Sequence, residues 1–371
     1  MRILTKALSA LLLASLHSPI AKAAEDKVLI VVSGEGQDQG KTRPGFEIDE
    51  LSQAYLIFRA NGLEVEIASP KGGPVEADKY NPQEPFNARL LADAAAMKQL
   101  AATRSTADLK AEDYAAIYIV GGKGAMFDLP RDTALKSLLA DAYQRGAVIA
   151  AVCHGPAALK DVRLADGSLL VAGKQVTGFT NEEEALFGKR WRAEFPFLLE
   201  DALRADGARW TEAPLMMPWL AVDGRLITGQ NPYSTTDVAE ALVKALGRQP
   251  VARERYRDER TMALVGELLE GKSDAVTSRL AGARNDYHVE LIGMLGYYQL
   301  QAAETDAAVR DALTVMQLAV PYMPMPELKL AIAQAHHRLG ESAPARRLVQ
   351  QLLDAKPDMQ EAKQLLQEID S

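Results

Sequence analysis

Short apolar runs that alternate with helix-like segments and glycine-rich turns constrain the fold of this chain more than any other feature. Between the first two runs, Ile48, Leu51, Tyr55 and Phe58 share one helical face, and the following Asn-Gly pair is expected to end that helix. Strands that alternate with helices predict a mostly parallel sheet with helices on both faces. Ligand-binding groups should then gather at the carboxyl ends of the strands. The predicted strands span residues 27–33, 65–69, 114–120, 147–152, 174–179 and 225–229.

The sequence changes character near residue 250, after which only helix patterns and short loops follow. We therefore predict an α/β domain over 24–249 and an all-α helical-repeat domain over 250–371. Gly340, Ala345 and Pro357 have the spacing of one tetratricopeptide-like unit, which is a pair of helices. A weaker second copy covers 291–321, and a further helix pair is expected over 260–283. Stacked pairs of this kind either offer a groove to a peptide or protein partner, or serve as a packing appendage or homodimer contact, and the sequence favours neither.

The first residues have the pattern of a secretory signal peptide. Arg2 and Lys6 precede an apolar stretch over 7–20, and Ala21-Lys22-Ala23 is a small-x-small cleavage pattern. The apolar stretch is too short to cross ~30 Å of hydrocarbon, so no membrane span is expected in the mature chain. We predict a signal peptide over 1–23 and, in a Gram-negative source, a periplasmic protein. The net charge of −8 and the lack of a basic stripe argue against a nucleic-acid partner.

Cys153 is the only cysteine of the chain, so no intramolecular disulfide can form. It follows the apolar run 147–152 directly and precedes His154, Gly155 and Pro156. This pattern predicts a buried strand that enters a sharp turn and then a helix, with the sulfur near the helix amino terminus, where the dipole favours a thiolate. Cys153 is therefore a candidate nucleophile. The alternative is a buried cysteine that acts as a small hydrophobic residue beside an incidental histidine.

Six blocks of sequence resemble the DJ-1/PfpI superfamily and occur in the order that the family has. They are most similar to its branch of heat-shock-protein-31-like chaperones and glyoxalases. The resemblance does not extend over residues 250–371. It implies a flavodoxin-like, class I glutamine-amidotransferase-like fold for the part that it covers. The blocks are residues 45–51, 68–73, 121–124, 151–156, 177–184 and 223–232.

The resemblance also implies roles for individual residues. Cys153 would be the nucleophile, Glu50 an acid that contacts its sulfur, and Glu184 the acid that orients His154 in a Cys–His–acid triad. The backbone N–H groups of Gly122 and His154 are candidates for an oxyanion hole. Taken from the residues alone, the favoured interpretation of Glu50 is an exposed residue of an amphipathic helix, and the Gly-Gly pair could be a simple tight turn.

Two positions leave the implied site open. Glu183 is adjacent to Glu184, so the acid of the triad is uncertain by one position, and the run of three glutamates could instead be a solvated helix start. Lys123 stands where this branch usually has histidine. Its positive charge could favour anionic substrates, or it could mean that the substrate of the branch is not used.

The resemblance implies a cofactor-independent glyoxalase that converts methylglyoxal or glyoxal to lactate or glycolate. The alternatives are a stress-related chaperone or redox-sensing adaptor that binds a partner through its helical tail, and a cysteine peptidase. No histidine lies between His154 and His288, which argues against glutamine hydrolysis by a downstream triad histidine. With no histidine cluster and no phosphate-binding motif in the α/β part, we expect neither a metal nor an organic cofactor.

Overall fold

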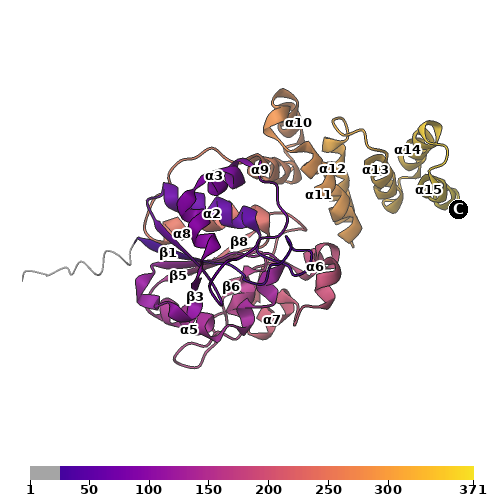
Figure 1. Ribbon diagram of the computed structural model, residues 1–371. Coiled ribbons are helices and arrows are strands. Elements are labelled where there is room, and N and C mark those ends of the chain that lie inside the picture. Colours follow the sequence, from indigo (N-terminus) through magenta and orange to yellow (C-terminus); the bar gives the residue numbers. More distant parts are fainter. Residues whose placement is uncertain (1–25) are drawn as a thin grey trace, which may run out of the picture.

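The computed structural model describes residues 26–371, so the predicted signal peptide over 1–23 lies outside the described residues. The α/β part is built on a seven-stranded sheet with the order β3-β2-β1-β4-β5-β9-β8 (Figure 1). All neighbouring strands are parallel except β8 and β9, which pair antiparallel at one edge. The predicted mostly parallel sheet is therefore confirmed. Its strands are β1 (Lys27–Val31), β2 (Glu64–Ser69), β3 (Arg104–Ser105), β4 (Ala116–Ile119), β5 (Val148–Val152), β8 (Leu220–Asp223) and β9 (Leu226–Gly229).

Helices cover both faces of the sheet, with α2, α3 and α8 on one side and α5 and α7 on the other (Figure 1). Strands β1, β4 and β5 are buried almost throughout, as expected for central strands covered on both faces. The helices of this part are α2 (Ile48–Ala60), α3 (Pro85–Ala92), α4 (Ala94–Ala101), α5 (Thr133–Gln144), α6 (Asn181–Phe187), α7 (Leu199–Ala205) and α8 (Thr235–Ala245).

The strand predicted over 174–179 is shorter than expected. Only β6 (Gln175–Val176) forms, and it pairs with β7 (Arg209–Trp210) in a separate two-stranded sheet. The backbone donors that follow β6 are used elsewhere, because Thr177 N–H donates to the Thr228 hydroxyl and Phe179 N–H donates to the Cys153 carbonyl. The segment is thereby tied to the turn after β5 instead of extending a ladder.

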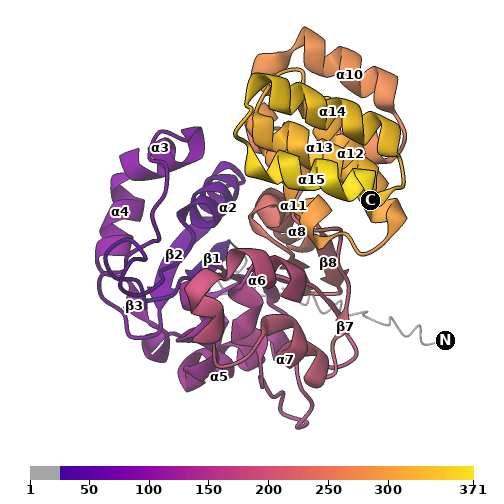
Figure 2. The ribbon, with the colours of Figure 1, turned by 90° about the vertical axis from the view of Figure 1, so that its right-hand side faces the viewer.

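The remainder of the described chain is helical, as predicted, and its helices form antiparallel neighbours joined by short loops (Figure 2). Helix α11 packs on α12, α13 on α14, and α14 on α15. The helix pairs fit the predicted repeat spacing, but their assignment as tetratricopeptide repeats stays a prediction. The helices are α9 (Arg257–Leu269), α10 (Ser273–Gly282), α11 (Val289–Ala302), α12 (Asp306–Ala319), α13 (Pro326–Arg338), α14 (Ser342–Ala355) and α15 (Gln360–Asp370).

The helical part shares a hydrophobic core with the α/β part. Leu215, Met216 and Met217, from the loop before β8, are buried in one cluster with side chains of α9, α11, α12 and α13. None of the described helices is long and apolar enough to cross a membrane. The domain boundary at 249/250 stays a prediction, since the last helix on the sheet ends at residue 245 and α9 begins at residue 257.

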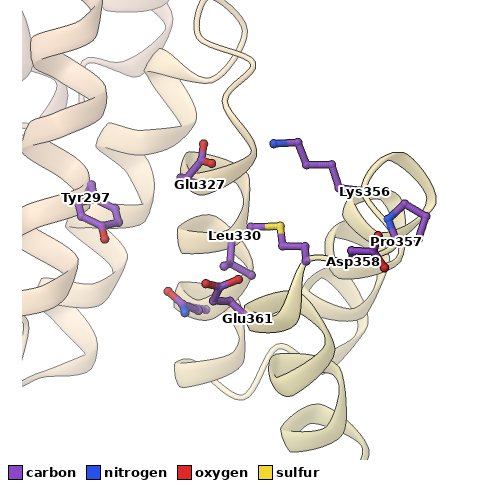
Figure 3. A pocket seen from close by; sticks show the side chains of 9 residues that line it. Tyr297, Glu327, Leu330, Lys356, Pro357, Asp358 and Glu361 are labelled. Atoms are coloured by element: carbon purple, nitrogen blue, oxygen red, sulfur yellow. The ribbon is translucent and has the colours of Figure 1, made fainter.

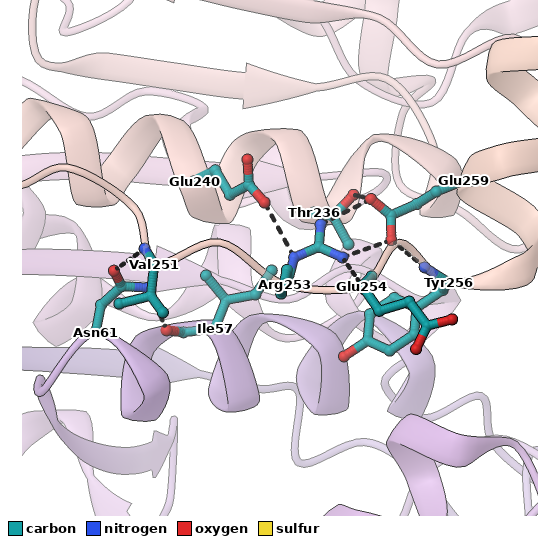
Figure 4. Close-up of polar contacts among 9 residues, drawn as sticks. All are labelled: Ile57, Asn61, Thr236, Glu240, Val251, Arg253, Glu254, Tyr256 and Glu259. Carbon is teal, nitrogen blue, oxygen red and sulfur yellow. Dashed lines mark hydrogen bonds and ion pairs between the residues drawn. The ribbon is translucent and has the colours of Figure 1, made fainter.

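An ion-pair network fixes the linker between α8 and α9 (Figure 4). Arg253 donates to both carboxylate oxygens of Glu259, at 2.7 Å each, and to Glu240 at 3.0 Å. Glu259 also accepts from the Tyr256 backbone N–H at 2.7 Å and from the Thr236 hydroxyl at 3.0 Å. A bidentate guanidinium–carboxylate pair with every oxygen further hydrogen-bonded is the geometry in which a charge pair is worth most. The helical part is thus anchored on α8.

Replacing Glu259 by glutamine is expected to lower the free energy of unfolding by about 2 kcal/mol, because it leaves the mostly buried Arg253 with an incomplete partner. Thermal or urea unfolding followed by circular dichroism measures the loss. The matched control is Glu254→Gln, whose side chain is 89% exposed and makes one 3.3 Å contact with Arg260. The control should change stability by less than about 0.5 kcal/mol. Equal effects of the two variants would show that the network does not fix the linker.

Candidate active site

Cys153 lies at the carboxyl end of β5, in a turn that few residues adopt. Its φ of +58° falls in the left-handed region, which costs a non-glycine residue about 1 kcal/mol or more. Two backbone hydrogen bonds hold it there: Cys153 N–H donates to Gly229 C=O at 2.9 Å, and its carbonyl accepts from Phe179 N–H at 2.8 Å. The side chain is 4% exposed. A strained cysteine presented between two strand ends matches the predicted sharp turn.

Two glycines let neighbouring backbones approach this turn. A Cβ on Gly155 would lie 2.5 Å from the carbonyl oxygen of Ile119, at the end of β4. A Cβ on Gly121 would lie 2.8 Å from both Cys153 Cβ and a carboxylate oxygen of Glu50. Any side chain at Gly121 would therefore push Glu50 and Cys153 apart.

His154 joins the cysteine to Glu184. Its Nδ1 lies 3.4 Å from Cys153 Sγ, and its Nε2 lies 2.7 Å from Glu184 Oε2. The imidazole is 2% exposed, and its ring lies 4.4 Å from the ring of Phe179. The structure thus brings the three predicted triad residues together, although two of them are adjacent in the chain. An acid on the far nitrogen fixes the tautomer of the imidazole and stabilises its charged form.

Glu183 and Glu184 do different things. Helix α6 begins with a capping box, in which Thr180 accepts from Glu183 N–H and Glu183 accepts from Thr180 N–H. The other carboxylate oxygen of Glu183 accepts from Asn231 at 2.8 Å, Gln230 at 3.2 Å and the Met216 backbone at 3.1 Å. Burial raises the pKa of Glu183 to about 7. Glu183 therefore holds the backbone, while Glu184 contacts His154, and the alternative of a wholly solvated helix start is wrong for both.

Glu50 is fully buried in the first turn of α2, so the alternative of an exposed helix residue is wrong. One carboxylate oxygen accepts from Gly121 N–H at 2.6 Å, and Gly121 separates the Glu50 side chain from Cys153. Burial, reinforced by the neighbouring Glu47 carboxylate, raises the pKa of Glu50 well above its usual value. A carboxyl group in this environment can hold a proton near neutral pH and release it to a reacting group.

The environment of the thiol differs from expectation. The segment after Cys153 is a 3-10 helix of only five residues, Gly155–Leu159, so the predicted thiolate-favouring helix dipole is absent there. Burial raises the pKa of Cys153 well above its usual value, the negative charge of Glu50 raises it further, and the Gly122 N–H opposes both. Two buried acids beside each other disfavour a second negative charge, so Glu50 and Cys153 titrate as a coupled pair in which ionisation of one opposes ionisation of the other.

Gly122 and Lys123 complete the rim of the site. The backbone N–H of Gly122 lowers the pKa of the Cys153 thiol, and the φ of +87° at Gly122 needs glycine. Burial raises the pKa of Glu47 to about 8 and also raises the pKa of Asp78, and the charge of Lys123 opposes both shifts. Lys123 thus lies near acids of the protein, and both interpretations of its charge stay predictions. The oxyanion role of Gly122 and His154 stays a prediction.

Three residues that support the triad carry no predicted role in the sequence. Gln230 and Asn231, directly after β9, hold Glu183, and Phe179 stacks on His154. Two consecutive amide side chains at the end of a predicted buried strand could have indicated a polar network there, because buried amides need hydrogen-bond partners.

A cysteine at a strained strand-to-helix turn, paired with a histidine and an acid on a mostly parallel α/β sheet, defines a nucleophile-elbow class of protein. The chain belongs to the DJ-1/PfpI family, which matches residues 42–245, more than half of its length. This match ends before the helical part begins.

Curated relatives support the same grouping. The chain is 33% identical to the glutathione-independent glyoxalase hsp3101 of Schizosaccharomyces pombe, over 60% of this chain and 96% of that protein. It is 31% identical to the glutathione-independent glyoxalase HSP31 of Saccharomyces cerevisiae, over 60% and 99%. Among solved structures, glyoxalase III of Candida albicans superposes with a TM-score of 0.55 at 26% identity, covering 60% of this chain and 97% of the other.

Proposed function

We propose that this protein is a glutathione-independent glyoxalase that uses Cys153 as nucleophile and Glu50 and His154 for proton transfer. The relatives that bear this name match 60% of this chain at 33% and 31% identity, and the site geometry supports the proposal. The observation that carries the proposal is the buried Glu50, which faces the only thiol of the chain across Gly121. An isomerisation needs this acid, whose raised pKa suits both proton donation and acceptance.

The reaction is an internal redox rearrangement, so it needs no external oxidant or reductant. With the shared proton on Glu50, the Cys153 thiolate adds to the aldehyde carbon of methylglyoxal, and the resulting oxyanion takes the proton from Glu50. The product of this step is a hemithioacetal, and Glu50 is now a carboxylate.

Proton transfers then convert the hemithioacetal into a thioester. Glu50 removes a proton from the former aldehyde carbon while His154, which is paired with Glu184, donates a proton to the ketone oxygen to give an enediol. Glu50 returns its proton to the second carbon, and His154 takes the proton of the first hydroxyl. The first carbon is thereby oxidised and the second reduced, and water releases lactate and the thiol.

The exposure of the nucleophile favours a small substrate over a peptide. Cys153 and His154 are 4% and 2% exposed, so a three-carbon aldehyde could reach the sulfur with little rearrangement, whereas a peptide bond would need the surrounding turns to open. This burial places the cysteine-peptidase alternative below the glyoxalase.

Incubation of the purified protein with methylglyoxal, without glutathione or metal, tests the proposal. D- or L-lactate should accumulate in step with the loss of methylglyoxal, at a rate proportional to protein concentration. Absence of lactate between pH 6 and 9, from protein shown to be folded by circular dichroism, would exclude the glyoxalase.

For the helical part we propose a peptide partner that is basic and carries an apolar anchor. A hollow of about 670 Å³ lies between α13 and the α14–α15 turn, with Tyr297 of α11 at its side (Figure 3). Its apolar floor includes Leu330 and Met359, and its charged rim holds Glu327, Asp358 and Glu361 against one cation, Lys356. An acidic rim over an apolar floor complements a basic peptide. Titration with a fluorescent lysine- and leucine-containing peptide should give saturable binding that Glu327→Lys weakens, and binding of an acidic peptide instead would contradict the proposal.

We also propose, from the pattern of residues 1–23, that this activity is exported to the periplasm of a Gram-negative source. Amino-terminal sequencing of the protein from a periplasmic fraction should begin at Ala24, and recovery of the full-length chain from the cytoplasm would contradict export.

A further inference from the structure

The C-terminal helices cover the part of the α/β domain that carries the acid of the triad. Leu186 and Phe187, at the end of α6, pack against the hydrophobic cluster that the helical part forms with residues 215–217. Helix α6 has only seven residues and carries both Glu183 and Glu184. A helix this short is not stable by itself, so its position depends on the surfaces that it contacts.

One contact from the helical part reaches Glu183 through the backbone. Gln299 of α11, which is 8% exposed, donates its side-chain N–H to the Leu215 carbonyl at 3.0 Å. The next residue, Met216, has a left-handed φ of +62° and donates its N–H to Glu183 at 3.1 Å. Gln299 therefore holds the strained loop whose backbone in turn holds the residue before Glu184.

A second contact reaches the other end of α6. The ring of Tyr298 meets the ring of Phe187 edge to face, with 4.9 Å between centroids. Phe187 is the last residue of α6, three positions after Glu184 and less than one helical turn away. Adjacent residues of α11 thus contact both ends of α6. Gln299 acts at the amino-terminal side of α6 through residues 215 and 216, and Tyr298 packs at its carboxyl end.

We infer that the helical extension positions Glu184 against His154, and that Tyr298 and Gln299 are the positioning residues through which it does so. This inference rests on the proposed function for its kinetic consequence. The family match ends at residue 245, so the contacts of Tyr298 and Gln299 come from a part of the chain that lies outside the family domain. Because Glu184 and His154 are 2.7 Å apart, a shift of α6 by about 1 Å would break their hydrogen bond.

The test compares Tyr298→Ala with Gln301→Ala, which shortens an exposed side chain of the same helix. Tyr298→Ala should lower kcat for methylglyoxal ten- to a hundredfold with KM changed less than about threefold, as expected for a misplacement of about 1 Å. Tyr298→Phe keeps the ring and should retain the activity. In a Glu184→Gln background, Tyr298→Ala should have little further effect, because the residue acts through Glu184.

A readout that does not need glyoxalase activity keeps the two proposals separate. The pH profile of the rate at which iodoacetamide alkylates the single thiol should shift in Tyr298→Ala in the same direction as in Glu184→Gln, and it should not shift in Gln301→Ala. If the wild type makes no lactate, the proposed function fails while this profile still tests the positioning. If Tyr298→Ala does not fold, Gln299→Met is measured in its place. A pH profile and a kcat equal to those of Gln301→Ala would overturn the inference.

Discussion

Alanine in place of Cys153 is expected to abolish lactate formation from methylglyoxal, with a loss of at least about 10³-fold in kcat/KM. No other thiol exists in the chain to replace the nucleophile. The remaining groups, Glu50 and His154, could still move protons, but without a carbon–sulfur bond no thioester can form. Lactate release measured by an enzyme-coupled assay, with the uncatalysed rate subtracted, gives the ratio.

The same substitution should leave the fold intact. Alanine keeps the Cβ and the backbone bonds of Cys153 to Gly229 and Phe179, and it removes one buried sulfur. We expect the free energy of unfolding to fall by about 1–2 kcal/mol. A thiol assay in urea should find no thiol, which confirms that the only cysteine has been replaced. Lactate formation by this variant at the rate of the wild type would show that the chemistry occurs elsewhere in the protein or in solution.

The sheet could be predicted because its strands are buried on both faces and therefore appear as apolar runs. The runs before Cys153 and before Ser33 correspond to β5 and β1 nearly residue for residue. The run before Phe179 predicted too long a strand, because apolar and β-branched residues there fill a turn whose N–H groups bond to Cys153 and Thr228. A run of apolar residues indicates that a segment is buried. It does not specify whether the backbone of that segment bonds to a neighbouring strand or to a turn.

The choice between Glu183 and Glu184 could have been made from the sequence. Thr180, followed three residues later by Glu183, is the pattern of a capping box, which assigns Glu183 to the backbone of the helix start. The next residue, Glu184, is then left free to face His154. The resemblance supplied the triad, and local helix chemistry would have resolved its acid.

Other features of the site depend on contacts between distant segments. The raised pKa of the Cys153 thiol results from burial and from Glu50, about a hundred residues earlier in the chain, whereas the sequence pattern predicted a thiolate-favouring helix start. The contact of Gln299 with Leu215 joins two parts that the sequence analysis treated as separate domains. Such pairings have no periodicity or spacing that a single sequence displays.

Replacing Glu50 by glutamine is expected to lower kcat about 10²- to 10⁴-fold, the usual contribution of a general acid–base group. Glutamine has nearly the shape of the protonated carboxyl group and can keep the acceptor position toward Gly121 N–H. It cannot take the proton of Cys153 or remove hydrogen from the hemithioacetal. The matched control is Asp49→Asn, which removes a carboxylate from the same turn of α2 where it bonds Asn87. The control should stay within about threefold of the wild type.

The pH dependence distinguishes a proton-transfer role of Glu50 from a structural one. Activity requires the Glu50–Cys153 pair with a single proton, so kcat/KM of the wild type should fall as the pH is lowered and the pair gains its second proton. Either site can lose that proton, so the first apparent pKa of the pair lies below the pKa that the Cys153 thiol has beside a neutral neighbour. Glu50→Gln leaves only the thiol, whose pKa burial raises, and the acidic limb should therefore move to higher pH. An acidic limb at the same pH in both proteins would mean that Glu50 only fills space beneath the thiol.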